Sequence, residues 1–361
     1  RLSLNSLAMP DSQDPLGLTR AQWEADPSQA APVALLFDTR KTSRQTTLGA
    51  EVQTPIAQRT TLTTALWAGT RSVIQFQSIP VATQTSPTSP GGVIDFDREF
   101  GGADVRATVE AGGLTTSIGL TAERLDEDRR GYNNFTGTAP DLTLGVQGAL
   151  RRDEVNRVDS LGPYLQAEYR AGEAWRLHAG VRATDVEFRS SDRYIVGVNG
   201  DDSGSIAYSG VTPSAGVVFR PSATTSVYAS YGRGFETPTL NELAYRADGS
   251  AGFNSGLRPA RSDNAEIGAK LAGRQLRAGF AAFMVRTKDD IVVRTNVGGR
   301  SSFGNAARTR RDGIEASTEW TPVTDLTLLV SAAVLRARFD SPFLTCGPPP
   351  CLTPTVPVPA S

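Results

Sequence analysis

Residues 264–284, NAEIGAKLAGRQLRAGFAAFM, decide the fold class of this chain. Up to Leu271, and again from Leu276, apolar residues occupy every second position, and polar or small residues fill most of the positions between them. The apolar set is Ala265, Ile267, Ala269, Leu271, Leu276, Ala278, Phe280, Ala282 and Met284. Successive side chains of a β-strand point to opposite faces of the sheet, so this spacing predicts two strands, each with one apolar face. Gly273 and Arg274 predict a tight turn between them.

The same alternation recurs along the chain. It is present in residues 117–123 (SIGLTAE), 161–169 (LGPYLQAEY), 175–184 (WRLHAGVRAT) and 313–320 (GIEASTEW). The polar faces carry ionisable side chains, namely Arg176, Arg182, Glu266, Lys270, Arg277, Glu315 and Glu319. A small barrel is filled by its own side chains, whereas these charges need water. They therefore predict a wide, wet lumen on the polar side of the strands.

Short and long connections alternate between the predicted strands. Short turns are predicted at residues 57–59, 112–113, 172–173, 221–224, 273–274 and 322–325. Long polar loops are predicted at residues 74–91, 126–141, 190–209 and 236–262. The spacing indicates about twelve strands, with part of another at the start, in an all-β, transmembrane, antiparallel up-and-down β-barrel. Outer-membrane barrels have short periplasmic turns and long extracellular loops, an asymmetry that a soluble sandwich or propeller has no reason to show.

Residues 1–361 are predicted to form one partial barrel domain. Lipid cannot satisfy the N–H and C=O groups of a bare sheet edge, so about twelve or thirteen strands with two bare edges require further strands. The opening RLSLNSL and the final TPTVPVPAS both read as truncation or processing points. Cys346 and Cys351 bracket CGPPPC, which predicts a local disulfide in an oxidising compartment. Two unrelated free thiols are the alternative.

Composition excludes several classes of protein. Hydrophobic residues make up 39% of the chain, and no stretch approaches the roughly 18 consecutive apolar residues of a spanning helix. The 37 Lys and Arg residues nearly cancel the 38 Asp and Glu residues, which argues against a nucleic-acid partner. His178 is the only histidine, and no serine or carboxylate stands at a catalytic spacing from it. The chain is therefore predicted not to be an enzyme and to need no cofactor, with His178 lining the lumen.

Metal chemistry is equally unsupported by the sequence. Two cysteines and one histidine do not make a metal site. The acidic stretches at residues 201–205 and 287–290 read more simply as solvated loops than as calcium sites. Trp67, Trp175 and Trp320 each fall within a predicted strand and are expected in the aromatic girdles that face the membrane interfaces.

Residues 228–243, YASYGRGFETPTLNEL, and residues 257–271, LRPARSDNAEIGAKL, resemble the C-terminal half of TonB-dependent outer-membrane receptors. Further similar elements lie in residues 303–320 and 326–339. The matching positions are Gly232, Gly234, Phe235, Pro238, Leu257, Pro259, Ser262, Glu266, Asn305, Gly313, Glu315, Ala337 and Phe339. Earlier segments, such as DPLGLTRAQWEADP at residues 14–27, look closest to the receptor subgroup for pyrroloquinoline quinone, long described as iron-siderophore receptors.

The resemblance implies a partner system as well as a fold. In the family, a complete barrel of about 22 strands encloses an N-terminal plug domain. The plug, its TonB box and the remaining strands are expected outside this sequence. The implied partners are TonB with ExbB and ExbD, a small-molecule ligand and outer-membrane lipid, and the implied state is a monomer in the outer membrane of a Gram-negative cell.

Ligand-binding residues are predicted from chemistry and position together. An anionic ligand, such as a quinone tricarboxylate or an acidic metal chelate, favours arginine forks and stacking aromatic rings. The candidates near extracellular strand ends are Arg71, Phe76, Arg129, Arg130, Tyr132, Arg233, Tyr245, Arg246 and Arg311. Each alone reads more simply as a rim or loop residue, but together they suit a water-filled vestibule.

The predicted function is TonB-dependent active transport of a scarce, bulky ligand, either a ferric siderophore or a redox cofactor such as pyrroloquinoline quinone. The alternative is a passive porin-like diffusion channel, which would have no plug domain upstream. An outer-membrane barrel enzyme would need an externally facing Ser/His pair, and a soluble or secreted β-protein would not need detergent.

Overall fold

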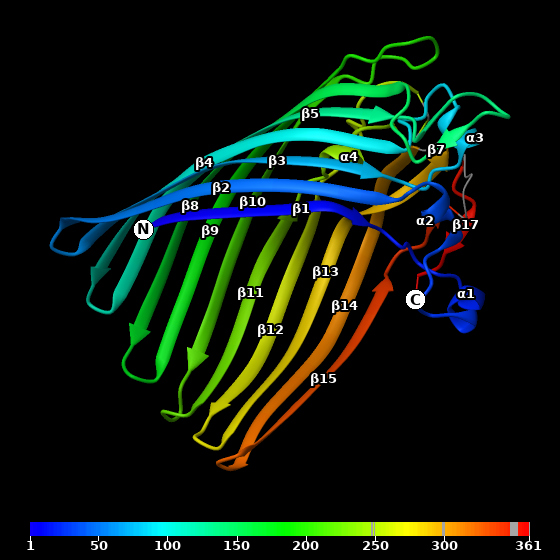
Figure 1. The fold of residues 1–361 in the computed structure, drawn as a ribbon. Helices are drawn as coiled ribbons and strands as arrows, with labels where there is room; N and C mark the ends of the chain where they lie inside the picture. The colour runs from blue at the N-terminus through cyan, green and yellow to red at the C-terminus, as the bar shows by residue number, and fades with distance from the viewer. Residues whose placement is uncertain (247, 249, 298–299, 347–352, 361) are drawn as a thin grey trace.

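The computed structural model describes residues 1–246, 248, 250–297, 300–346 and 353–360 (Figure 1). Its main feature is one 13-stranded antiparallel sheet in which every strand pairs with its neighbours along the chain. The strands are β1 (Leu2–Gln13), β2 (Arg40–Ala57), β3 (Thr60–Phe76), β4 (Val93–Ala111), β5 (Leu114–Tyr132), β8 (Leu150–Ala171), β9 (Trp175–Asp192), β10 (Gly204–Phe219), β11 (Thr225–Glu236), β12 (Ala260–Ala272), β13 (Leu276–Val297), β14 (Arg300–Val323) and β15 (Leu326–Phe339). The predicted all-β antiparallel fold is confirmed, and β1 and β15 form the two edges of this sheet.

The remaining elements are short. They are the helices α1 (Arg20–Ala25), α2 (Pro32–Leu36), α3 (Val81–Gln84) and α4 (Leu240–Leu243), and the small strand pairs β6 (Phe135–Thr136) with β7 (Thr143–Leu144) and β16 (Phe343–Thr345) with β17 (Val356–Val358). Within the described part of the chain, none of the helices has the length and apolar character needed to cross a membrane. Cys346 is disulfide-bonded, and Cys351 lies outside the described residues.

The six predicted short turns lie at one end of the sheet, and the long connections lie at the other end (Figure 1). The predicted turns between β2 and β3, β4 and β5, β8 and β9, β10 and β11, β12 and β13, and β14 and β15 are all present. Gly112 and Gly113 close one of them with φ angles of +57° and +82°, a left-handed pair that glycine adopts without strain. The connections that contain α3, β6 with β7, and α4 lie at the other end. We call these the short-turn end and the long-loop end.

The outward face of the sheet is apolar from the short-turn end to about the middle of each strand. On β9 the outward set runs through Trp175, Leu177, Ala179, Val181 and Ala183 and becomes charged at Asp185. This apolar stretch matches the roughly 9 to 11 residues with which a tilted strand crosses a bilayer. Ile118 is 63% exposed and Phe280 is 49% exposed on this face. These large apolar side chains are left open, as the alternation of the sequence predicts.

Two expectations about the strands are wrong. The charged segments from Asp126 and from Ser190 were expected in loops, but β5 continues to Tyr132 and β9 to Asp192. Polarity does not end β5 because its outward charges pair with β8, as in Arg124–Asp159 and Arg157–Asp126, both with N–O distances of 2.6 Å. On β9 the outward Arg189 pairs with Glu187 of the same strand, also at 2.6 Å. The strands therefore continue beyond the apolar band.

Trp67 is the second correction. It pairs with Gly102 on the inward face, where a Cβ atom on Gly102 would lie 2.4 Å from the indole ring, so Trp67 is not an outward girdle residue. Trp175 and Trp320 do lie outward, near the short-turn end.

Inward aromatic rings lie across glycines of the neighbouring strand. The pairs are Trp67 with Gly102, Tyr164 with Gly119, His178 with Gly216, Tyr228 with Gly268, and Phe283 with Gly313. Each glycine would place a Cβ atom within 2.5 Å of the ring, so no larger residue fits without movement. The rings lie along the wall instead of projecting from it, which keeps space free on the inward side.

Candidate ligand-binding site

The candidate site begins with a row of inward side chains near the long-loop end. Register places Arg98 on β4 opposite Glu127 on β5, and Glu127 opposite Asn156 on β8. The Glu127 carboxylate is 1% exposed and accepts hydrogen bonds from Arg98 and from the Asn156 side chain, the latter at 3.3 Å. A carboxylate this buried needs such partners, because an unpaired charge away from water is costly.

A second pair lies beside the first. Arg129 on β5 is opposite Glu154 on β8, and the Arg152 guanidinium donates two hydrogen bonds of 2.7 Å to the Glu154 carboxylate. Asn156 donates to the same carboxylate at 2.8 Å, so its amide joins the two acidic groups into one network. The network fixes the directions of the Arg98 and Arg152 side chains.

Tyr245 lies between two guanidinium groups. The Arg300 guanidinium carbon is 4.2 Å from the centre of the Tyr245 ring, and that of Arg152 is 5.4 Å from it. Arg300 also forms an ion pair with Asp202 at 3.1 Å and donates to the Asn199 side chain at 2.6 Å. Burial raises the pKa of the Asp202 carboxyl, against the opposing hydrogen bond from Gly252 and the charge of Arg300. Arginines from β8 and β14 therefore meet at the Tyr245 ring, and Arg300 links this ring to the loop between β9 and β10.

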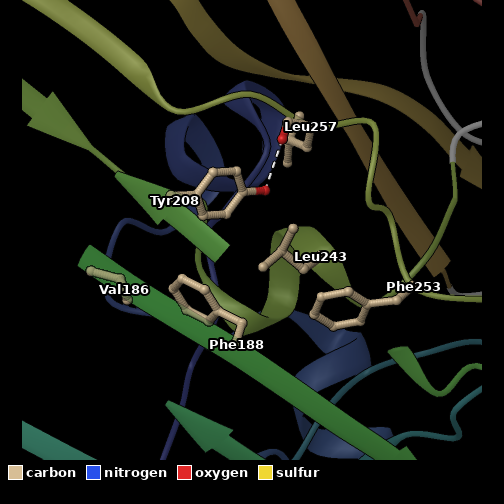
Figure 2. Packing of buried hydrophobic residues seen from close by; sticks show 6 residues of the cluster. All are labelled: Val186, Phe188, Tyr208, Leu243, Phe253 and Leu257. Atoms are coloured by element: carbon tan, nitrogen blue, oxygen red, sulfur yellow. Dashed lines mark hydrogen bonds between the residues drawn. The ribbon is translucent and has the colours of Figure 1, made fainter. Parts of the chain in front are cut away.

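An apolar cluster holds the loop that carries Tyr245 (Figure 2). Leu243 of α4 is fully buried, and with Phe253 and Leu257 it packs against inward side chains of β9 and β10. The Tyr208 hydroxyl donates a 2.7 Å hydrogen bond to the Leu257 carbonyl. A capping box at the start of α4 supports the same turn. The loop is thus anchored on the inward face, and Tyr245 follows its most buried residue by two positions.

The site has more cationic than anionic side chains. The arginines are Arg71, Arg98, Arg129, Arg152 and Arg300, and the carboxylates are Glu127, Glu154, Asp192 and Asp202. Arg71 is directly opposite Arg98 in the sheet. The Nε atoms of Arg71 and Arg300 are buried and have no hydrogen-bond partner. An excess of positive charge on the inward face favours an anionic ligand.

The sequence candidates separate into an inward and an outward group. Arg71, Arg129 and Tyr245 lie in the cluster, and Arg311 lies inward on β14, bonded to Asp290 at 3.2 Å. Arg246 lies on the α4 loop and binds Asp248 at 3.0 Å.

The other four candidates, Phe76, Arg130, Tyr132 and Arg233, belong to the outward set by strand alternation. Arg130 pairs with Asp128 at 3.2 Å, Arg233 pairs with Asp263 at 3.1 Å, and Arg40 stacks on Phe76 at 3.6 Å. The structure does not bring these four together with the cluster.

Sequence reasoning missed several members of the site. Arg98, Glu127, Arg152 and Glu154 were not singled out, and neither was Arg300. The available signal was strand alternation: once β5 and β8 are extended through their charged segments, Glu127, Arg129, Arg152 and Glu154 all fall on the inward face.

A polar pocket of about 900 Å³ lies farther toward the short-turn end on the inward face. It includes Asp104, Arg106, Tyr164, His178 and Arg182. The Tyr164 hydroxyl donates to the Asp104 carboxylate, whose two oxygens are each 3.1 Å away. His178 thus lies on the inward face, which is the face on which the sequence predicts it. Among the residues that the structure describes, no group of three His, Cys, Asp or Glu side chains could hold a metal ion.

Comparison with known proteins places this sheet in a family. Residues 6–348 match the family model for the TonB dependent receptor-like β-barrel. The chain therefore belongs to the TonB-dependent receptor β-barrel family, whose barrels are outer-membrane proteins.

Solved structures share the fold at low sequence identity. The siderophore receptor PiuA from Acinetobacter baumannii has a TM-score of 0.68 at 14% identity, with 87% of this chain and 50% of that chain covered. The copper transporter OprC has a TM-score of 0.68 at 16% identity, covering 83% and 48%. The unliganded ferric citrate transporter FecA has a TM-score of 0.66 at 17% identity, covering 93% and 49%. The chain spans about half the length of these proteins.

Proposed function

We propose that the protein containing this chain takes up a scarce, bulky, anionic ligand across the outer membrane, with energy supplied by TonB together with ExbB and ExbD. The long-loop end would face the outside and the short-turn end the periplasm, as in other outer-membrane barrels. The ligand would be an acidic metal chelate such as a ferric siderophore, or a quinone cofactor such as pyrroloquinoline quinone. The protein would act as a monomer, and no bond would be made or broken.

The observation that carries the proposal is the excess of guanidinium groups over carboxylates in the inward cluster that includes Tyr245. Arg71, Arg129 and Arg300 would meet the ligand's carboxylates, and the ring of Tyr245 would stack on a planar portion of it. Glu127 and Glu154 would orient the arginines without neutralising all of them. After the plug moves, the ligand would pass the polar pocket around Asp104 and Tyr164 on its way through the lumen.

Two adjacent arginines test the site directly. Arg129 faces inward and Arg130 outward, so Arg129→Ala should weaken binding whereas Arg130→Ala should leave it unchanged. Hydrogen bonds to charged groups contribute about 1.5–3 kcal/mol, so we expect Kd to rise by about 10- to 100-fold in the first variant. Titration of the full-length protein with pyrroloquinoline quinone and with several ferric siderophores would identify the ligand class.

Binding and uptake measurements test the site and the energy source separately. If Arg129→Ala, Tyr245→Ala and Arg311→Ala all retain full affinity for every anionic ligand, the proposed vestibule is wrong. Uptake by cells with and without TonB separates active transport from the porin-like alternative. Uptake that continues unchanged without TonB would support a passive channel.

A further inference from the structure

The outward face of β12, β13 and β14 carries directly opposed cations just beyond the apolar band. Arg286 on β13 is opposite Arg310 on β14, and Lys288 is opposite Arg308. Arg261 on β12 is opposite Lys288 on its other side. We call these five residues the basic patch. The rows begin immediately after Met284, the last apolar outward residue of β13.

Few acidic groups neutralise the basic patch. Arg310 pairs with Asp312 at 2.8 Å. Asp263 lies directly opposite Arg286, but its carboxylate is bound by Arg233 at 3.1 Å and by the Tyr231 hydroxyl at 2.6 Å. Within the described part of the chain, the side chains of Arg261, Arg286, Lys288 and Arg308 form no hydrogen bond or salt bridge, and all four are exposed.

The same level of the sheet is built differently on β5, β8 and β9. Between β5 and β8 opposite charges face each other, as in Arg124 with Asp159 and Arg157 with Asp126. Between β8 and β9 Arg157 is opposite Arg189, but each of the two binds a carboxylate, Asp126 or Glu187, at 2.6 Å. Like charges directly opposite each other destabilise a sheet, whereas opposite charges support it. The opposed cations of the basic patch therefore do not stabilise the pairing of β13 with β14. An anion from outside the chain would relieve their repulsion.

The position of the basic patch indicates which anion that is. Below it lies the open apolar surface of Phe280 and Ile314, which suits acyl chains, and above it the strands continue into polar surroundings. We propose that the basic patch binds the phosphate groups of anionic lipids in the leaflet at the long-loop end. Guanidinium forks match phosphate oxygens bidentately, and a lipid supplies both the phosphate and the chains beneath it. This inference rests on the membrane placement of the band and is independent of ligand uptake.

Native mass spectrometry of the full-length protein, supplied with phosphatidylglycerol or phosphatidylcholine, tests this proposal. We expect wild type to retain at least ten times more phosphatidylglycerol than phosphatidylcholine. The triple variant Arg286→Gln, Lys288→Gln, Arg308→Gln should lose that preference. A matched variant, Arg124→Gln, Arg157→Gln, Arg189→Gln, removes as many cations from the paired region of β5, β8 and β9 and should keep it.

A charge-preserving variant separates the loss of charge from a loss of the fold. Arg286→Lys, Lys288→Arg, Arg308→Lys should bind lipid like wild type, and heat-modifiable gel migration should show that each variant is folded. The proposal is overturned if the glutamine variant keeps its lipid or if both glutamine variants lose it equally. It is also overturned if millimolar inorganic phosphate displaces the lipid, which would indicate a free-anion site. Loss of an oligomer without loss of lipid would instead indicate an interface between copies.

Discussion

The two faces of β5 differ in which kind of side chain they leave exposed. Glu127 on the inward face is 1% exposed within a network of arginines, whereas Ile118 on the outward face of the same strand is 63% exposed. In a water-soluble protein the isoleucine would be buried and the carboxylate open to water. This reversal shows that the two faces suit different surroundings. Outward side chains meet lipid without any protein partner. Inward side chains near the long-loop end meet loops and other charges.

Loosening the inward loop anchor should have the largest effect. Leu243 is fully buried in the apolar cluster, so Leu243→Ala should cost about 2–5 kcal/mol of loop docking. Because the cluster holds one loop and not the whole sheet, hydrogen exchange should accelerate around residues 237–259 and stay unchanged in β2, which contributes no residue to the cluster. Val33→Ala, at a half-exposed position on α2, is the control and should change neither. Uniform acceleration across all strands would contradict this local role.

A charge placed on either face should distinguish lipid from lumen. Ala316 faces outward opposite Phe280, and Ser317 faces inward opposite Gly279. Ala316→Arg should destabilise the protein in a bilayer by about 2–4 kcal/mol, the range for arginine at the midplane. Ser317→Arg should cost less than about 1 kcal/mol because its guanidinium reaches water in the lumen. Denaturant titrations in lipid vesicles would measure the free energy of unfolding of each variant. Equal losses in the two variants would show that the two faces do not meet different surroundings.

Two inward glycines, one covered by an aromatic ring and one not, allow a comparison within the inward face. A Cβ atom on Gly119 would lie 2.4 Å from the Tyr164 ring, so Gly119→Val should cost about 1–3 kcal/mol through overpacking. Gly279 also faces inward, but its nearest neighbour is a serine hydroxyl at 3.3 Å. Gly279→Val should therefore be close to neutral. Similar losses of stability for both variants would show that the rings are not what requires glycine.

Surface ion pairs should give the smallest effect. Arg124 and Asp159 pair at 2.6 Å on the outward face beyond the apolar band, with the arginine side chain 59% exposed. Exposed pairs contribute about 0–1 kcal/mol and are screened by salt. Arg124→Gln should therefore lower stability slightly at low ionic strength and not at all in molar salt. A loss that persists in high salt would indicate that this pair does more than join β5 to β8.

Sequence and structure agree where alternation alone decides the outcome. Ile267 and Phe280 face outward because period two fixes the face once the strand is recognised. The polarity of the stretch around Arg129 predicts a loop, whereas β5 continues through it because its outward charges pair with β8.

The packing of Tyr245 between Arg152 and Arg300 lies beyond sequence reasoning. It depends on how a long loop docks on strands far away in the chain. The position of Trp67 could not be predicted either. Its apolar character suggests the outward face, but its register with Gly102 places it on the inward face.

The central claim is that the apolar face meets lipid and the opposite face meets water. Spin labels placed singly at residues 278–282 of β13, in the full-length protein in a bilayer, test it most directly. We expect oxygen accessibility to peak at Ala278, Phe280 and Ala282, and a water-soluble nickel chelate to reach Gly279 and Ala281, in strict alternation. Labels at Phe280 and its outward neighbours that both reagents fail to reach would place this face in a dry protein core and contradict the account.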